Sequence, residues 1–197
     1  SITGCVPRAN CPKRQEKRLW YDRNGPRYCL RTITTTAFMD RTSSVSASLT
    51  KASWNIAIGK NALYTQSFDA GVDSCWYSYN VAVGYEALYA NGPTEVSNAI
   101  SNTALGTFAL RSNITGGFNL ASGAYALYQN TFGNENTAIG TNALATNNTG
   151  SRNTALGFFA DVTVDSLSNA TAIGYNAKVA ASNALVLGGI GPDAVQV

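Results

Sequence analysis

Apolar and polar positions alternate in a short segment that recurs along most of the chain. In residues 136–144 (NTAIGTNAL), Thr137 and Ile139 point to one side of an extended strand, and Ala138 points to the other. An aliphatic residue stands directly before the glycine in six copies, and Ser122 interrupts this column. The aliphatic residues are Ile58, Val83, Leu105, Ile139, Leu156 and Ile173. This alternation predicts a series of short β-strands.

Glycines close these strands at a nearly constant step. The glycine at the same position of each copy is Gly59, Gly84, Gly106, Gly123, Gly140, Gly157, Gly174 and, in a looser copy, Gly188. The successive intervals are 25, 22, 17, 17, 17, 17 and 14 residues. One small unit repeated many times predicts a solenoid, with glycine as the turn residue because it adopts φ > 0 without penalty.

Asparagines supply the other turn signals. One stands four residues before most of the glycines, at Asn55, Asn80, Asn102, Asn119, Asn136 and Asn153, and we expect it to form a turn. A second turn signal occurs in residues 113–116, 130–133 and 147–150. Two strands and two turns fit a coil of this length, and frequent Gly and Asn disfavour helix. The predicted fold class is therefore all-β.

The alanines form a column on the strand face opposite to the aliphatic residues. Small side chains let another backbone approach closely, as at the axis of a packed oligomer. Because the core of such a thin roll is narrow, we interpret the alanine columns as the faces through which several chains pack side by side.

The repeat N-T-A-I-G-x-x-A-L resembles the head repeat of YadA-like trimeric autotransporter adhesins. It is also similar to a longer-spaced variant in phage tail-fibre-like surface proteins that carry C-terminal intramolecular chaperones. The resemblance covers about residues 52–191, and residues 183–192 resemble a closing coil. It implies a left-handed parallel β-roll of about seven to eight coils, assembled as a homotrimer without enzymatic activity. The long coils and residues 1–50 depart from the family pattern.

Charge divides the chain near the start of the repeat. Residues 1–51 contain ten Lys or Arg and three acidic residues, a net charge of +7. The rest contains four basic and eight acidic residues, so −4, which gives the total of +3. We expect a basic arm (1–51), a roll (52–191) and a tail (192–197). A docking role for the arm is favoured over nucleic-acid binding, because no nucleic-acid module is recognisable.

The cysteines indicate an oxidising environment. An even number of cysteines in a repetitive, Asn- and Thr-rich chain is typical of an extracellular protein with disulfides. Cys5 is expected to pair with Cys11 or Cys29, and the remaining arm cysteine with Cys75 or another chain. A zinc site is disfavoured because there is no C-x-x-C and no histidine, and no metal or other cofactor is expected. The sequence has no membrane-spanning stretch and no signal-peptide core, as expected for a processed product.

Aromatic residues and sequons are the candidate surface sites. The aromatic residues near the turn after the glycine are Tyr85, Phe108, Tyr125, Phe158 and Tyr175. They suit contact with a glycan, a matrix protein or a neighbouring rod, but packing along the roll is favoured. Trp54, Trp76 and Tyr77, with Cys75, are expected to cap the open end. Asn113, Asn147 and Asn169 begin N-x-T sequons, which the repeat also generates by its composition.

Catalysis is not expected. The acidic residues closest to a pair are Asp69 with Asp73 and Asp161 with Asp165, and the chain has no histidine to serve as a base. A carbohydrate-active β-helix enzyme is accordingly the least favoured of three functions.

The predicted function is structural: a subunit of an extracellular, cell-surface or virion fibre. Residues 31–50 are either an irregular first coil or an arm that adds a strand to a neighbour. A basic arm that meets the acidic rod of the next subunit predicts head-to-tail polymerisation. The alternative is an adhesin head that binds host matrix protein or glycan.

Overall fold

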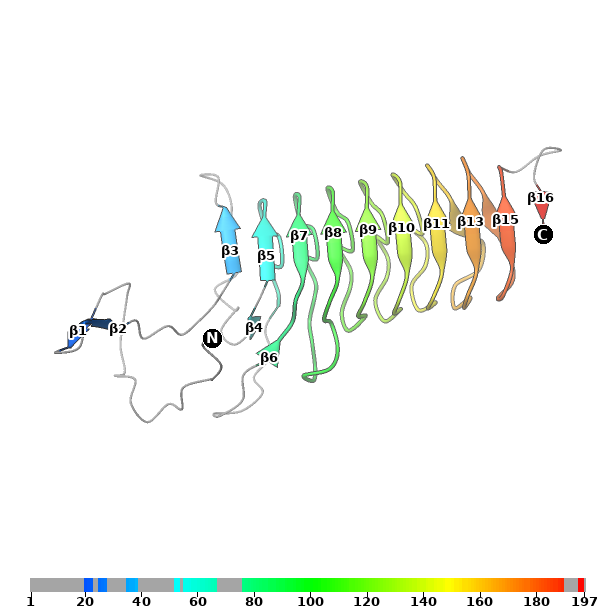
Figure 1. Cartoon of the computed structure of the whole chain (residues 1–197). Helices are drawn as coiled ribbons and strands as arrows, with labels where there is room; N and C mark the ends of the chain where they lie inside the picture. Colours follow the sequence, from blue (N-terminus) through cyan, green and yellow to red (C-terminus); the bar gives the residue numbers. More distant parts are fainter. Residues whose placement is uncertain are drawn as a thin grey trace.

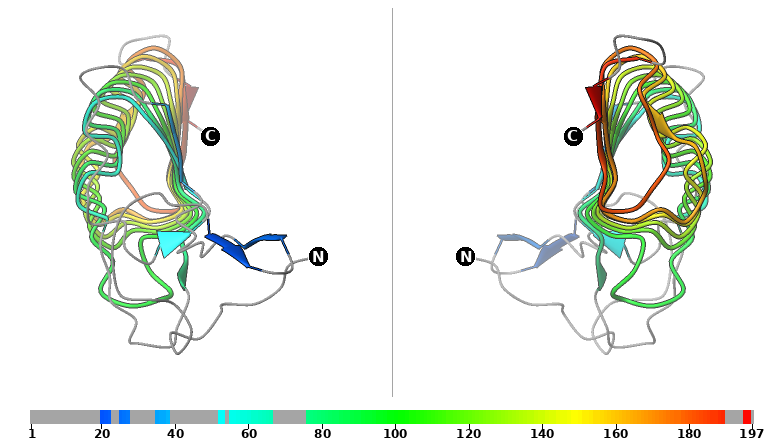
Figure 2. Two further views of the ribbon diagram at one scale, coloured as in Figure 1. Left: turned by 90° about the vertical axis from the view of Figure 1, so that its left-hand side faces the viewer. Right: turned by 90° about the vertical axis from the view of Figure 1, so that its right-hand side faces the viewer.

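The chain forms a parallel β-solenoid, as a computed structural model shows (Figure 1). The structure describes residues 55–66 and 78–189, together with the backbone of strands at 20–22, 25–27, 35–38, 52–53, 76–77 and 195–196. The described residues contain no helix, so the expected all-β repeat fold is confirmed. Viewed along the axis, the coils superpose as an elongated ring (Figure 2).

One long sheet forms a wall of this ring. Its strands are β3 (Thr35–Phe38), β5 (Asn55–Ile58), β7 (Val81–Val83), β8 (Thr103–Leu105), β9 (Leu120–Ser122), β10 (Thr137–Ile139), β11 (Thr154–Leu156), β13 (Thr171–Ile173), β15 (Leu185–Leu187) and β16 (Val195–Gln196). All neighbours from β3 to β15 are parallel, whereas β15 and β16 are antiparallel. Each predicted tripeptide before a glycine is therefore a strand of this sheet.

Three smaller pairs complete the strand inventory. β1 (Trp20–Asp22) and β2 (Gly25–Arg27) are antiparallel. β4 (Ala52–Ser53) pairs in parallel with β6 (Trp76–Tyr77), and β12 (Asp161–Val162) pairs in parallel with β14 (Lys178–Val179).

The alanines of the strands lie inside the roll, which corrects the expectation that they pack against other chains. Ala138 and the equivalent alanines of the neighbouring coils are fully buried within the single chain. Across the narrow interior they belong to the same core as the leucines that follow the glycine turns, such as Leu127 and Leu144. Because those leucines fill the interior, the strand wall can contribute only methyl groups. The aliphatic residues of the strands consequently point outward.

The asparagine four residues before each of six glycines belongs to a buried ladder rather than to the expected turn, which is a second correction. The backbone N–H of Asn119 donates to Oδ1 of Asn102 (3.0 Å), and that of Asn136 donates to Oδ1 of Asn119 (2.9 Å). The positive φ of this corner belongs to the preceding residue, such as Phe118 at 60°. The amide side chain thus links one coil to the next inside the roll, where an unpaired backbone N–H is costly.

A second asparagine ladder runs beside the first, and the two share acceptors. Nδ2 of Asn130 donates to Oδ1 of Asn113 (3.0 Å) and to the carbonyl of Gly133 (3.0 Å). Nδ2 of Asn119, from the first ladder, donates to the same Gly133 carbonyl at 2.9 Å. Each such carbonyl therefore uses both lone pairs, and the two turn signals of a coil are joined by hydrogen bonds.

The glycine column sets the spacing of the coils. All eight glycines identified in the sequence have positive φ, from 88° at Gly188 to 140° at Gly123. A Cβ added to Gly123 would lie 2.5 Å from the backbone carbonyl of Gly140 in the next coil. No side chain fits between successive coils at this corner, so glycine is required by close approach as well as by conformation.

The N-terminal segment extends the sheet. β3 pairs with β5 so that Ala37 lies opposite Ala57, which places residues 35–38 in the strand position of a preceding coil of the same chain. This arrangement matches the irregular first coil rather than an arm given to a neighbour. Trp76 and Tyr77 form β6, but Trp54, the cysteines and the proposed cap lie outside the described side chains.

We predict that Gly123→Ala destabilises the roll by about 3 kcal/mol or more, because backbone strain and the clash with the Gly140 carbonyl add together. Gly92→Ala is the matched control, since its Cβ would lie 3.4 Å from the nearest atom and its φ is not positive. Urea unfolding followed by circular dichroism measures both. Equal losses in the two variants would contradict the account.

Candidate interaction surfaces

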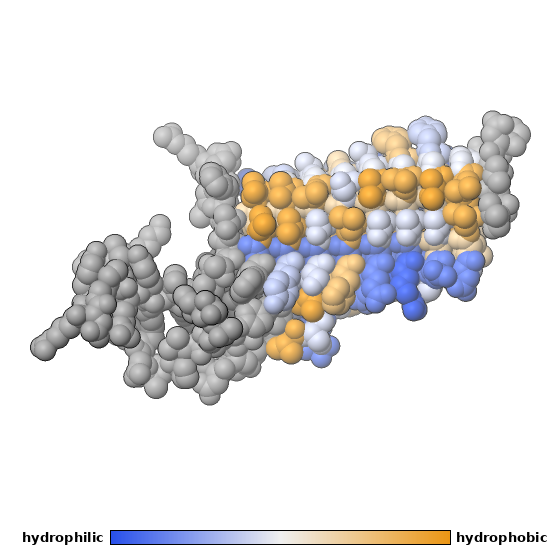
Figure 3. Space-filling model, viewed as in Figure 1, coloured by the Kyte–Doolittle hydropathy of each residue, from blue (hydrophilic) through white to orange (hydrophobic). Residues whose placement is uncertain are grey.

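The outer side of the long sheet is an apolar strip, which we call the aliphatic face. It follows the strands in two rows (Figure 3). The row directly before the glycines is aliphatic except at Ser122, and the row three positions before the glycines contains aliphatic residues and threonines such as Thr137. The most exposed members of the face include Ile139 (40% exposed) and Leu156 (46%). The residues of the row next to the glycines are Ile58, Val83, Leu105, Ser122, Ile139, Leu156, Ile173 and Leu187. Ser122 interrupts this row, as the sequence predicted, but Leu120 on the same strand keeps the strip apolar.

The aliphatic face is continuous because the strands are in register. Ala138 lies opposite Ala121 and Ala155, so Ile139 lies between Ser122 and Leu156. At about 4.8 Å per strand, the eight strands from β5 to β15 give a strip about 34 Å long. A contiguous apolar strip of this kind marks an interaction surface more strongly than scattered apolar residues do.

One flank of the aliphatic face is formed by the positive-φ residue five positions before each glycine. It carries the exposed rings of Tyr79 and Phe118 in the N-terminal half, and the exposed charges of Glu135 and Arg152 in the C-terminal half. The other described members of this flank are polar: Ser101, Asn169 and Asn183.

The turn segments that follow the glycines form the wall of the ring opposite the sheet (Figure 2), and these segments carry a group of aromatic residues. We call it the aromatic cluster, and it contains Tyr64, Tyr85, Tyr89, Phe108, Tyr125 and Tyr128. Tyr64 stacks on Tyr89 with ring centroids 5.1 Å apart. Phe108 is perpendicular to Tyr85 and tilted against Tyr125, with centroids 5.2 and 5.0 Å away.

An ion pair lies at the centre of the aromatic cluster. Nε of Arg111 donates to Oε2 of Glu86 at 2.6 Å, and the guanidinium lies over the rings of Tyr89 and Phe108, at 5.2 and 5.7 Å from their centroids. Burial favours the protonated form of Glu86, but hydrogen bonds from Arg111 and Tyr85 outweigh it and hold the pKa of this carboxyl below its usual value. The pair is consequently charged, and it fixes the surrounding rings.

The remaining predicted aromatic residues, Phe158 and Tyr175, lie apart from this cluster. They stack on each other in the C-terminal coils with centroids 5.9 Å apart, and Tyr175 is 72% exposed. The sequence-predicted aromatic residues therefore form two groups, separated by a coil that carries Thr141 and Asn142 instead.

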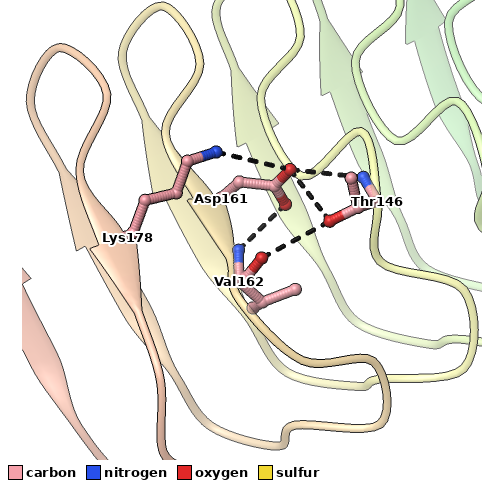
Figure 4. Close-up of polar contacts among 4 residues, drawn as sticks. All are labelled: Thr146, Asp161, Val162 and Lys178. Carbon is pink, nitrogen blue, oxygen red and sulfur yellow. Dashed lines mark hydrogen bonds and ion pairs between the residues drawn. The ribbon is translucent and has the colours of Figure 1, made fainter.

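A buried acid marks the point where the repeat changes. Asp161 and Lys178 occupy the position that leucines such as Leu144 fill in earlier coils. Asp161 accepts hydrogen bonds from the Thr146 hydroxyl (3.0 Å) and the Val162 N–H (2.9 Å), and it lies 3.8 Å from Nζ of Lys178 (Figure 4). Burial raises the pKa of the Asp161 carboxyl above its usual value, although Lys178 and Thr146 act in the opposite direction.

Asp161 and Asp165 bind different partners: Asp161 contacts Thr146 and Lys178, whereas Asp165 accepts from Asn148 and Thr149. Burial acts to raise the pKa of Asp165, but the N–H groups of Thr149, Asn148 and Ser166 lower it, so this carboxylate serves to close a turn. Over residues 55–66 and 78–189, no three His, Cys, Asp or Glu side chains gather as metal ligands. Asp69 and Asp73 lie outside the described residues.

Two of the three sequons belong to the interior. Asn113 and Asn147 are fully buried members of the second ladder, so their amides are not available for glycan attachment in the folded chain. Asn169 is exposed and donates to Oδ1 of Asn183 at 3.0 Å. Cys5, Cys11, Cys29 and Cys75 all lie outside the described residues.

Neither ion pair was predicted from the sequence, although the sequence carries a signal for one of them. When the coils are aligned on their glycines, the leucine column ends in an acid and a base 17 residues apart, Asp161 and Lys178. Glu86 and Arg111 give no such signal, because they stand two and five residues after their glycines and so do not face each other in this alignment. Charges of opposite sign at facing repeat positions predict contact between coils.

No protein family, no curated protein and no solved structure matches this chain. Within the part of the chain that the structure describes, no helix is long and apolar enough to cross a membrane.

We predict that Lys178→Ala destabilises the C-terminal coils by roughly 1–3 kcal/mol at pH 7, because it leaves the buried Asp161 carboxylate without its cation. Asp161 binds its proton more tightly in the folded chain than in the unfolded chain, so its protonated form favours folding at acidic pH. This contribution is lost as the pH rises from about 3.9, the unfolded pKa, through the higher folded pKa.

The loss caused by Lys178→Ala should therefore be smaller near pH 4 than at pH 7. Thermal unfolding at both pH values measures it, with the double variant Asp161→Asn/Lys178→Ala as the control that has no charge to titrate. A pH-independent loss in the single variant would show that the two side chains are not coupled.

Proposed function

We propose that the protein is a structural subunit of an extracellular, cell-surface or virion fibre, in which three chains pack through their aliphatic faces. The observation that carries this proposal is the exposure of aliphatic side chains such as Ile58, Leu105 and Leu156 along the strands from β5 to β15. Burial of about 25 cal/mol per Å² of apolar surface favours association through such a strip. The resemblance to trimeric adhesin heads supplies the copy number, the left-handed roll and the count of about seven to eight coils.

The interior of the roll supports a structural role. Two asparagine ladders and a glycine column resist sliding between coils, so the rod is suited to transmit force or to hold ends apart. The interior of each described coil has no room for a ligand, because side chains such as Ala138 and Leu144 fill it.

The direct test is the native mass together with a charged substitution in the aliphatic face. The native protein should have three times the chain mass of 20.7 kDa in light scattering after size exclusion. Ile139→Glu would bury an unpaired carboxylate at the axis, which we expect to raise the dissociation constant roughly a hundredfold or more.

Val164→Glu is the matched control, because Val164 is comparably exposed but does not belong to the sheet. It should leave the trimer intact. A native monomer, or equal dissociation of both variants, would overturn the proposed assembly.

Polymerisation through the N-terminal arm is the second part of the proposal. Its support is the charge asymmetry of +7 against −4. Removing residues 1–30 keeps β3 at the edge of the sheet and deletes seven of the ten cations of the arm. We expect this truncation to abolish filaments in electron micrographs while it preserves the native mass of the discrete assembly. Filaments that persist unchanged would contradict this part.

A further inference from the structure

The aromatic cluster is not required by the fold. In the coil that begins at Gly140, Thr141, Asn142 and Ala145 occupy the positions that Tyr85, Tyr125 and Tyr128 fill in other coils. That coil makes the same backbone hydrogen bonds, for example from Asn142 N–H to the Ala124 carbonyl at 2.9 Å. The rings are therefore an addition to a coil that folds without them.

Five rings of the cluster form one continuous, rigid surface. The Arg111 guanidinium already covers the faces of Tyr89 and Phe108, which holds both rings in place. Tyr64, Tyr85 and Tyr125 remain exposed beside them, and adjacent ring centroids are about one coil step apart. Rigid aromatic rings with hydroxyl groups give a large contact area at a low cost in conformational entropy.

The electrostatics of the cluster disfavour a nucleic acid. Binding to a phosphate backbone requires several unpaired cations. Of the four cations in residues 55–66 and 78–189, Arg111 is paired with Glu86 and Lys178 with Asp161. What the cluster offers instead is a set of exposed rings, tyrosine hydroxyls and a charge-neutral ion pair.

We infer that the aromatic cluster binds a neutral carbohydrate chain. The C–H faces of pyranose rings pack on Tyr85 and Tyr125, while the ring hydroxyls bond to the polar edge formed by Arg111 and the tyrosine hydroxyls. The coil step is close to the length of one sugar residue in an extended chain, so successive rings can contact successive sugars. This site lies on the wall opposite the aliphatic face, and it does not depend on the assembly proposed above.

The test uses the full chain and two linear hexasaccharides, one of glucose and one of N-acetylglucosamine. Titration calorimetry should detect binding of at least one. Tyr125→Asn and Tyr85→Thr install the residues that the Gly140 coil carries at these positions, so the coil should still fold. Each should weaken binding about tenfold, as expected for the loss of one aromatic contact.

Phe158→Thr is the matched control, since it removes an exposed ring at the same coil position as Tyr85 but outside the cluster. It should leave the affinity unchanged, and light scattering should show the same assembly in every sample. The inference is overturned if neither hexasaccharide binds, or if Phe158→Thr weakens binding as much as Tyr125→Asn. It is also overturned if a sulfated hexasaccharide or a triple-helical collagen peptide binds the cluster while both neutral probes do not.

Discussion

The whole rod depends on the fact that successive coils cannot slip relative to one another. Gly123 and Gly140 approach so closely that no side chain fits between their backbones. At another corner, the side chains of Asn119 and Asn130, which belong to different turns, both donate to the carbonyl of Gly133. Each coil is thus fixed at two corners, and every outward-facing side chain repeats at the same place. The continuous aliphatic face and the aligned rings of the aromatic cluster are both consequences of this register.

The sequence was sufficient for the period of the repeat, the position of the strands and the fold class, because the glycine step and the alternation of Thr137, Ala138 and Ile139 are local signals. It was not sufficient to tell which side of a strand faces inward, since alternation defines two faces without assigning them. The interior takes Ala138 because the space is already occupied by the leucines of the other wall. Asn119 was assigned to a turn for a similar reason: its partners lie in other coils, and its side-chain chemistry suits both roles.

The two walls of the roll carry different chemistry. The sheet presents aliphatic side chains such as Ile139 and Leu156, which suit burial against another copy of the same surface. The opposite wall presents tyrosines held around a charged pair, Glu86 and Arg111. Because the two surfaces lie on different walls, the proposed assembly and the proposed carbohydrate binding would not compete for the same residues. The C-terminal coils follow a third pattern, in which Asp161 and Lys178 stand at the sequence position of the leucines, and Val162 and Val179 belong to the core.

Burial of the aliphatic face in the native assembly is the central claim, and hydroxyl-radical footprinting of the unmodified protein tests it most directly. Ile139 (40% exposed in the single chain), Leu156 (46%) and Val164 (56%) differ little in their accessibility before assembly. If the aliphatic faces meet, Ile139 and Leu156 will oxidise several-fold more slowly than Val164. Comparable oxidation rates at all three positions would show that the sheet is open to solvent, and would contradict the account.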